Sequence, residues 1–122
     1  MKFPVRALAL VGVLVTATVL AACSSSSSPT PSSTRVEISA TEFMFDPDPI
    51  VVPANKVVEI VLANGGVVEH DLTIDSLGFA LKVAIGETKT GQIGPLEPGT
   101  YEVYCAVVGH KEAGMTTTLT VQ

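Results

Sequence analysis

A chain of 122 residues is long enough for one ordinary domain. Its 7 Lys and Arg side chains are outnumbered by 12 Asp and Glu, which gives a formal charge of −5 at pH 7. This acidic balance argues against nucleic acid or an anionic lipid surface as a partner, because both attract proteins through a basic face.

The chain begins with the pattern of a secretory signal peptide, predicted over residues 1–22. Lys2 and Arg6 make a basic start, and an apolar run follows from 7 to 22. A membrane-spanning helix needs roughly 20 apolar residues, and this run is shorter, as in a signal peptide. We expect an exported protein; an uncleaved membrane anchor is the alternative.

The apolar run ends in LAAC, residues 20–23, which resembles the lipobox of bacterial lipoproteins. That resemblance implies that Cys23 is lipidated, with acyl chains such as palmitate, and becomes the first mature residue. We therefore expect the protein to be anchored to the outer face of a bacterial membrane, in the periplasm or at the cell surface. Removal of residues 1–22 would leave 5 basic against 12 acidic residues, a formal charge of −7.

A flexible linker is predicted over residues 24–34, SSSSSPTPSST, because Ser and Pro at this density cannot bury a core. The remaining residues, 35–122, are expected to form the single domain. Two cysteines in an exported protein normally suggest a disulfide. A lipidated Cys23 would instead leave Cys105 as a lone thiol in an oxidising compartment, which needs an explanation.

The domain alternates apolar and polar residues with period two and shows no convincing helical period. Strands are predicted at 35–40, 57–64, 70–74, 101–105 and 115–121. Turn signals rich in Pro, Gly, Asn and Asp separate these runs, whereas 75–84 fits a loop, a strand or a short helical turn. Many short strands at this spacing predict an all-β sandwich or barrel.

One local motif favours a Greek-key sandwich. The segment LEPGTY, residues 96–101, matches a tyrosine corner, in which a Tyr hydroxyl bonds to backbone a few residues upstream. An ordinary Pro-Gly turn before a strand Tyr is the alternative. A corner at Tyr101 places Cys105 at the far end of the same strand.

Four side chains with nitrogen or sulfur donors are predicted to meet at one end of the sandwich. Cys105 ends a strand with its side chain inward, His110 lies in the next loop, and Met115 opens the following strand on its inward face. His70 starts another inward-facing alternation. Thiolate and thioether ligands select copper, and two His with one Cys and a distant Met make a blue-copper arrangement. Zinc would accept Cys and His but has no use for the thioether.

The segments EHDLTI and YCAVVGHKEAGM resemble those of the cupredoxins, the small blue-copper fold of plastocyanin, azurin and rusticyanin. The resemblance covers residues 35–122 and implies an all-β Greek-key sandwich of seven or eight strands. It also implies one type 1 copper, held by His70, Cys105, His110 and Met115.

The chain departs from the cupredoxin pattern next to two ligands. Asp71 stands where the family commonly has an Asn that ties the two ligand loops together, and Ala106 offers no hydroxyl after the Cys. The resemblance to azurin-like sites also suggests the backbone carbonyl of Glu69 as a weak axial ligand. Met44 is interpreted as surface or core filling.

The resemblance implies an electron carrier, cycling Cu(II) and Cu(I), rather than an enzyme. Transient docking of a redox donor and acceptor is expected at an apolar patch around His110, formed by Val107, Val108, Gly109 and Ala113, and the protein is expected to be a monomer. Copper storage or delivery and a metal-free adhesion-like sandwich are the alternatives. A dinuclear copper centre would need a second cysteine, and two histidines cannot build a further copper cluster for a substrate.

Overall fold

The computed structural model describes residues 34–122. The predicted signal peptide, Cys23 and the linker up to residue 33 lie outside the described residues, and Thr34 belongs to the first strand rather than to the linker. Within residues 34–122, no helix has the length and apolar character to cross a membrane.

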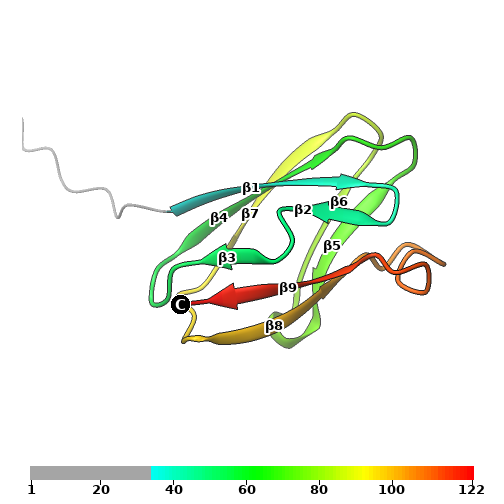
Figure 1. The fold of residues 1–122 in the computed structure, drawn as a ribbon. Helices are drawn as coiled ribbons and strands as arrows, with labels where there is room; N and C mark the ends of the chain where they lie inside the picture. The colour runs from blue at the N-terminus through cyan, green and yellow to red at the C-terminus, as the bar shows by residue number, and fades with distance from the viewer. Residues whose placement is uncertain (1–33) are drawn as a thin grey trace, which may run out of the picture. The chain divides into compact units, whose positions relative to one another are not determined.

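Nine strands form two facing sheets (Figure 1). The first sheet has the order β2-β1-β4-β7, with the bounds Met44–Asp46, Thr34–Thr41, Val58–Asn64 and Thr88–Ile93. The second has the order β3-β9-β8-β5-β6, with the bounds Ile50–Val52, Thr116–Val121, Gly99–Tyr104, His70–Ile74 and Phe79–Val83. Both sheets are mixed, since β1 pairs parallel to β4 and β3 parallel to β9, while the other pairs are antiparallel.

The all-β sandwich is confirmed, with nine strands in place of the seven or eight expected. The difference comes mainly from β2 and β3, which have 3 residues each and are too short to show a period in the sequence. Segment 75–84, left open by the sequence, contains a short 3₁₀-helix, Asp75–Leu77, and strand β6. Gly78 separates the two with φ of 60°, a left-handed conformation that suits glycine.

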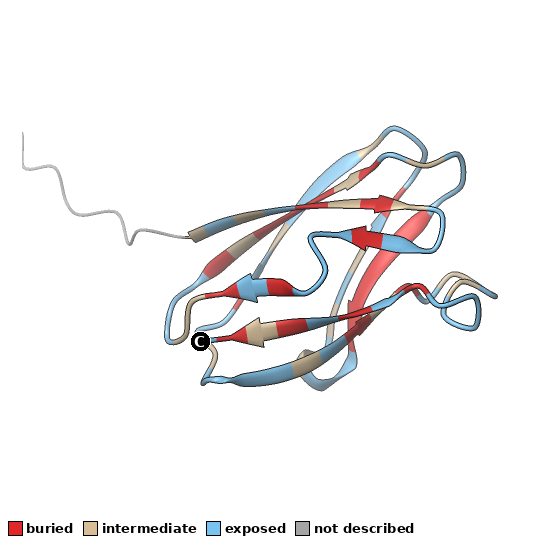
Figure 2. Cartoon of the chain, in the orientation of Figure 1, coloured by how far each residue is buried: buried red, intermediate tan, exposed pale blue. Residues whose placement is uncertain are grey.

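The core lies between the sheets and is built from the alternating apolar residues of both (Figure 2). Ile38, Leu62, Leu72 and Leu119 are each at most 2 % exposed. Burial of each such side chain contributes roughly 1.5–3 kcal/mol to folding. The apolar residues predicted to share a face on β1, β4, β8 and β9 therefore hold the two layers together.

Strand β5 differs from the alternation that the sequence suggests. All five of its residues are buried, including Asp71 and Thr73, which were expected to face away from the core. β5 lies between β6 and β8, and Asp71 bonds to the backbone of Ala106 in the loop after β8. Polar side chains are tolerated at this depth because they are hydrogen-bonded.

The tyrosine corner is present at the start of β8. The Tyr101 hydroxyl donates a hydrogen bond to the carbonyl oxygen of Glu97, at 3.4 Å and four residues upstream. From there β8 runs to the end of the sandwich where β1 and β4 also finish and where β5 and β9 begin (Figure 1). The loops of that end carry the candidate ligands.

Candidate metal centre

Three of the four predicted ligands meet at this end of the sandwich. The donor atoms of His70, Cys105 and His110 all lie within 4.8 Å of one another. His70 is the first residue of β5, Cys105 follows the last residue of β8, and His110 lies in the loop between β8 and β9. Two separate loops thus deliver one thiol and two imidazoles to a common point.

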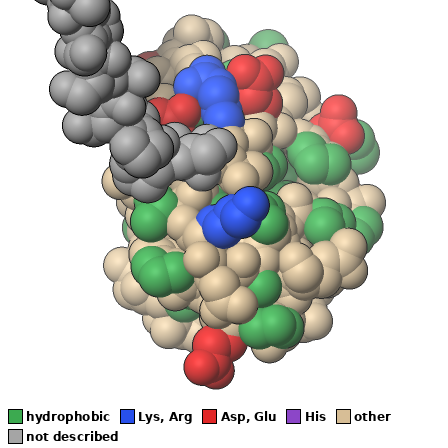
Figure 3. All heavy atoms as spheres, turned by 90° about the vertical axis from the view of Figure 1, so that its left-hand side faces the viewer, with side chains coloured by type: hydrophobic (Ala, Val, Ile, Leu, Met, Phe, Trp, Pro, Cys, Tyr) green, Lys and Arg blue, Asp and Glu red, His purple; other side chains and the backbone are tan. Residues whose placement is uncertain are grey.

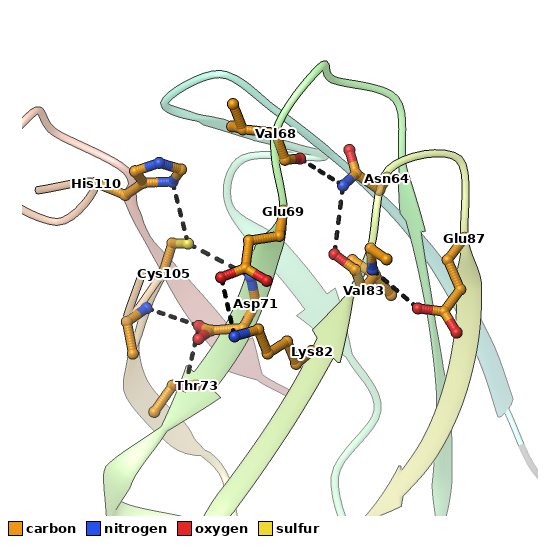
Figure 4. Close-up of polar contacts among 12 residues, drawn as sticks. Asn64, Val68, Glu69, Asp71, Thr73, Lys82, Val83, Glu87, Cys105 and His110 are labelled. Atoms are coloured by element: carbon orange, nitrogen blue, oxygen red, sulfur yellow. Dashed lines mark hydrogen bonds and ion pairs between the residues drawn. The ribbon is translucent and has the colours of Figure 1, made fainter. Parts of the chain in front are cut away.

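The Cys105 sulfur is fully buried and faces the other two ligands. His110 Nδ1 lies 3.5 Å from it, and the backbone N–H of Asp71 donates to it at 3.4 Å (Figure 4). Burial raises the pKa of the Cys105 thiol because the thiolate loses hydration, and the N–H groups of Asp71 and Val107 offset part of that effect. A metal ion would displace the proton and take the thiolate.

The ligand loop, residues 105–115, is closed by its own backbone. Cys105 N–H donates to the Met115 carbonyl at 3.1 Å, and Met115 N–H donates to the His110 carbonyl at 2.9 Å. Gly109 and Gly114 have φ of 84° and 98°, which favour glycine at both bends. The loop positions its ligands through these bonds, which do not depend on a bound metal.

His70 is a buried histidine whose ring lacks hydrogen bonds. Its side chain is 0 % exposed, and neither Nδ1 nor Nε2 has a hydrogen-bond partner among residues 34–122. The loop that leads to it is held by Asn64, whose side chain donates to Val68 O at 2.7 Å and accepts from Gly66 N–H at 2.8 Å (Figure 4). A polar ring buried without partners is costly, so this ring fits a missing ligand.

His110 is only partly buried and lies at the surface of the site. Its ring centroid lies 5.1 Å from that of His70 and 5.5 Å from that of Phe43, which meets it edge to face. Phe43 belongs to the turn between β1 and β2 and is 46 % exposed. The side chain of Phe43 therefore shields one face of the more accessible imidazole.

Asp71 ties the two ligand-bearing segments together despite replacing the usual Asn. Its Oδ1 accepts the Ala106 N–H at 2.7 Å and the Thr73 hydroxyl at 3.2 Å (Figure 4). Ala106 takes part through its backbone alone, so a hydroxyl at that position is not needed for the tie. A buried carboxylate thus lies beside the Cys105 segment, where an amide would be neutral.

Met115 is fully buried directly before β9, and its backbone is bonded to both Cys105 and His110. The coordination of a metal by the Met115 thioether stays a prediction, as does that by the Glu69 carbonyl. The Glu69 side chain faces away, in an ion pair with Lys82 at 3.0 Å (Figure 4). Met44 is 62 % exposed and thus a surface residue.

The predicted docking residues differ in accessibility. Val108 is 97 % exposed, and Gly109 and Ala113 are exposed as well. Val107 is partly buried and packs against the core, so its side chain offers less surface to a partner.

Two residues of the β1–β2 turn near the site were not singled out from the sequence. Phe43 packs on His110, and Glu42 Oε1 lies 3.5 Å from His70 Nε2. The hydrogen bond from the Val67 N–H holds the pKa of Glu42 below its ordinary value. No local signal reveals these contacts, because they depend on how β1 packs beside the loop after β4.

The donor set fits copper. One thiol and two imidazoles suit a metal that accepts both soft and borderline ligands, and a buried thioether lies in the same loop. Within residues 34–122, Glu42 Oε1 at 3.5 Å is a nearby polar group for Nε2 of His70, whereas Nδ1 has no hydrogen-bond partner and is not explained by protein contacts.

The sequence profile of the cupredoxin-like domain matches residues 13–121. The chain belongs to the cupredoxin-like family. With the His–Cys–His cluster, this membership assigns one copper ion as the cofactor of the domain. No curated protein matches the chain in sequence.

Solved cupredoxin structures share the fold at low identity. Auracyanin B is 26 % identical with a TM-score of 0.65, over 78 % of this chain and 92 % of that one. Auracyanin A, a "blue" copper protein from Chloroflexus aurantiacus, is 21 % identical with a TM-score of 0.60, over 73 % and 98 %. The periplasmic domain of cytochrome oxidase subunit II from Bradyrhizobium japonicum is 15 % identical with a TM-score of 0.64, over 73 % and 83 %.

Proposed function

We propose that this cupredoxin is a membrane-tethered type 1 blue-copper electron carrier, which passes single electrons between redox proteins outside the cytoplasmic membrane. The observation that carries the proposal is the meeting of Cys105, His70 and His110 at one end of the sandwich. Bound copper supplies a one-electron Cu(II)/Cu(I) couple there. His70, Cys105 and His110 would hold it, and the thioether of Met115 is the candidate for a fourth ligand.

The protein restricts the movement of these ligands and shields them from water. Cys105, His70 and Met115 are fully buried, which excludes water from three sides of the site. The backbone bonds of the ligand loop and the Asp71 tie restrict movement of both segments. Hydrogen bonding at the sulfur and the apolar shell around it are the means by which a protein tunes such a site.

Electrons would pass through His110, the ligand that is partly exposed. The docking surface would combine Val108, Gly109 and Ala113 with Phe43 and Val67, which are 46 % and 75 % exposed. These residues lie in the loops of the ligand end. Figure 3 shows the opposite end of the sandwich, where apolar and charged side chains are scattered among backbone and other side chains.

An electron carrier suits the residues better than an enzyme does. Both histidines of the chain are placed in the one site, which leaves no imidazole for a second copper cluster. Cys105 is the one free cysteine within the described residues, so a dinuclear centre with two thiolates is not built here.

The decisive experiment is the optical spectrum of the purified domain with added Cu(II). We expect an intense visible band from the thiolate–Cu(II) bond, and ascorbate should bleach it reversibly. Cys105→Ser should abolish the band while far-UV circular dichroism remains that of the folded sandwich. A wild-type protein that binds Cu(II) without such a band would contradict the proposal.

The tether rests on Cys23 and is tested separately. Cys23→Ala should release or mislocalise the protein, because the acyl chains supply the membrane affinity. The comparison is membrane association before and after a salt wash, for wild type and variant. Unchanged association of the variant would favour an uncleaved apolar helix instead.

A further inference from the structure

The turn between β1 and β2 reaches the ligand end and brings a carboxylate to the buried histidine. Glu42 Oε1 lies 3.5 Å from His70 Nε2. The same oxygen accepts the backbone N–H of Val67 at 2.6 Å, so the carboxylate is held in place by the loop that carries His70. Glu42 thus reaches the site from the β1–β2 turn of the first sheet, whereas His70 belongs to β5 of the second sheet.

Gly66 provides the space for this contact. A Cβ atom built at Gly66 would collide with Glu42 Oε1 and would lie 2.9 Å from His70 Nε2. The φ of Gly66 is not in the left-handed region, so the backbone alone does not demand glycine there. The demand comes from the Glu42 carboxylate and the His70 ring, which together occupy the volume that a side chain would need.

A neutral imidazole carries one proton, and the nitrogen that binds a metal must be the one without it. Nε2 of this fully buried ring lies 3.5 Å from the Glu42 carboxylate, and no other acceptor in the described part of the chain bonds to it. A metal ligand His usually donates its second ring N–H to a carboxylate or carbonyl, which fixes the tautomer and the ring orientation.

We propose that Glu42 is a positioning residue for His70: its carboxylate accepts the Nε2–H and leaves Nδ1 free to face Cys105 and His110. This inference rests on the proposed function in that copper is taken as the metal that His70 binds. Neither the ligand spacing nor the cupredoxin resemblance pointed to Glu42.

The first arm of the test needs no metal. Long-range ¹H–¹⁵N NMR spectra of the copper-free protein at neutral pH report which ring nitrogen of His70 carries the proton. We expect the Nε2–H tautomer in the wild type and a mixture of tautomers in Glu42→Ala. A wild-type His70 with its proton on Nδ1 would overturn the proposal.

The second arm measures copper retention against a competing chelator. Loss of a carboxylate partner to a ligand His typically costs about 10–100-fold in metal affinity, and we expect a loss in this range for Glu42→Ala. Glu42→Gln keeps an acceptor oxygen and should recover most of the affinity. Gly66→Ala keeps the charge, but its methyl group would press on both the Glu42 carboxylate and the His70 ring, so it should weaken binding in the same direction as Glu42→Ala.

Glu37→Gln is the matched control, because it removes one negative charge from β1, the strand that leads to Glu42, and its exposed side chain pairs with Arg35 at 3.3 Å rather than with a residue of the site. Its copper affinity should stay at the wild-type value. If Glu42→Ala keeps the wild-type copper retention and the wild-type His70 tautomer, Glu42 only accepts the Val67 N–H, and the proposal is wrong. A wild type without the visible copper band would contradict the proposed function, while the NMR arm would still decide the role of Glu42.

Discussion

Replacing Asp71 with Asn should raise the reduction potential of the bound copper. Asp71 is 9 % exposed and bonds to the residue directly after Cys105. A negative charge near the site stabilises Cu(II) relative to Cu(I), because the oxidised site carries one more positive charge. Asn has the same shape and can still accept the Ala106 N–H through its amide oxygen.

The size of the effect follows from Coulomb's law. At a separation on the order of 6 Å and an effective dielectric constant of about 20, one unit charge contributes roughly 2.8 kcal/mol. For a one-electron couple this corresponds to about 120 mV. Solvent at the partly exposed His110 side of the site and mobile ions screen part of this interaction, so we expect a rise of roughly 50–100 mV.

The assay is a spectroscopic redox titration of wild type, Asp71→Asn and Thr73→Val. Thr73→Val removes the second hydrogen bond to Asp71 Oδ1 but leaves the charge, and should change the potential far less. A potential of Asp71→Asn equal to or below that of the wild type would refute the electrostatic reasoning. Loss of the visible band in Asp71→Asn would show instead that the loop tie requires a carboxylate.

Three further predictions concern the pKa of the Cys105 thiol, the role of Met115 as a ligand and the docking surface. Burial raises the pKa of the Cys105 thiol, so alkylation of the copper-free protein should need a higher pH than alkylation of the unfolded chain. The neutral thiol stabilises the fold fully at pH values below the pKa of the unfolded chain. This stabilisation is lost as the pH rises through the pKa of the folded protein. Alkylation rates across pH check this, and a midpoint below the unfolded value would contradict it. Met115→Gln should lower the reduction potential and Met115→Leu should raise it; an unchanged potential in both would remove Met115 from the coordination sphere. Val108→Lys should keep the visible spectrum but slow stopped-flow transfer to the redox partner, whereas Val57→Lys, at the other end of the sandwich, should not; equal rates for both would place the docking surface elsewhere.

The sequence predicted those parts of the fold that have a local period. β1, β4, β5, β8 and β9 lie within one or two residues of their expected bounds, because four of them alternate apolar and polar residues and β4 is a nearly continuous apolar run. β2 and β3 are too short for a period, and β7 has a mostly exposed, polar sequence. The pairing of β1 with β4 in parallel depends on packing between distant segments and leaves no local sequence signal.

The candidate site likewise contains some residues that the sequence predicts and others that it does not. The spacing of Cys105, His110 and Met115 within one loop pointed to their convergence, and His70 was found from its place at the start of an alternating run. Glu42 and Phe43 reach the histidines from another strand, so only the three-dimensional arrangement reveals them. The role of Asp71 was likewise open until its bond to Ala106 placed the carboxylate beside the ligands.

The direction of β1 has a consequence for how the protein would meet its partners. β1 has 8 residues and begins at Thr34, while its last residue, Thr41, lies next to the turn that contacts the histidines. At about 3.3 Å per residue, the chain enters the domain roughly 25 Å from the redox end. If Cys23 is acylated, the tether joins the domain at Thr34, at the end of β1 that lies away from the partly exposed imidazole of His110. A partner could then approach from the aqueous side without the anchor having to leave the membrane.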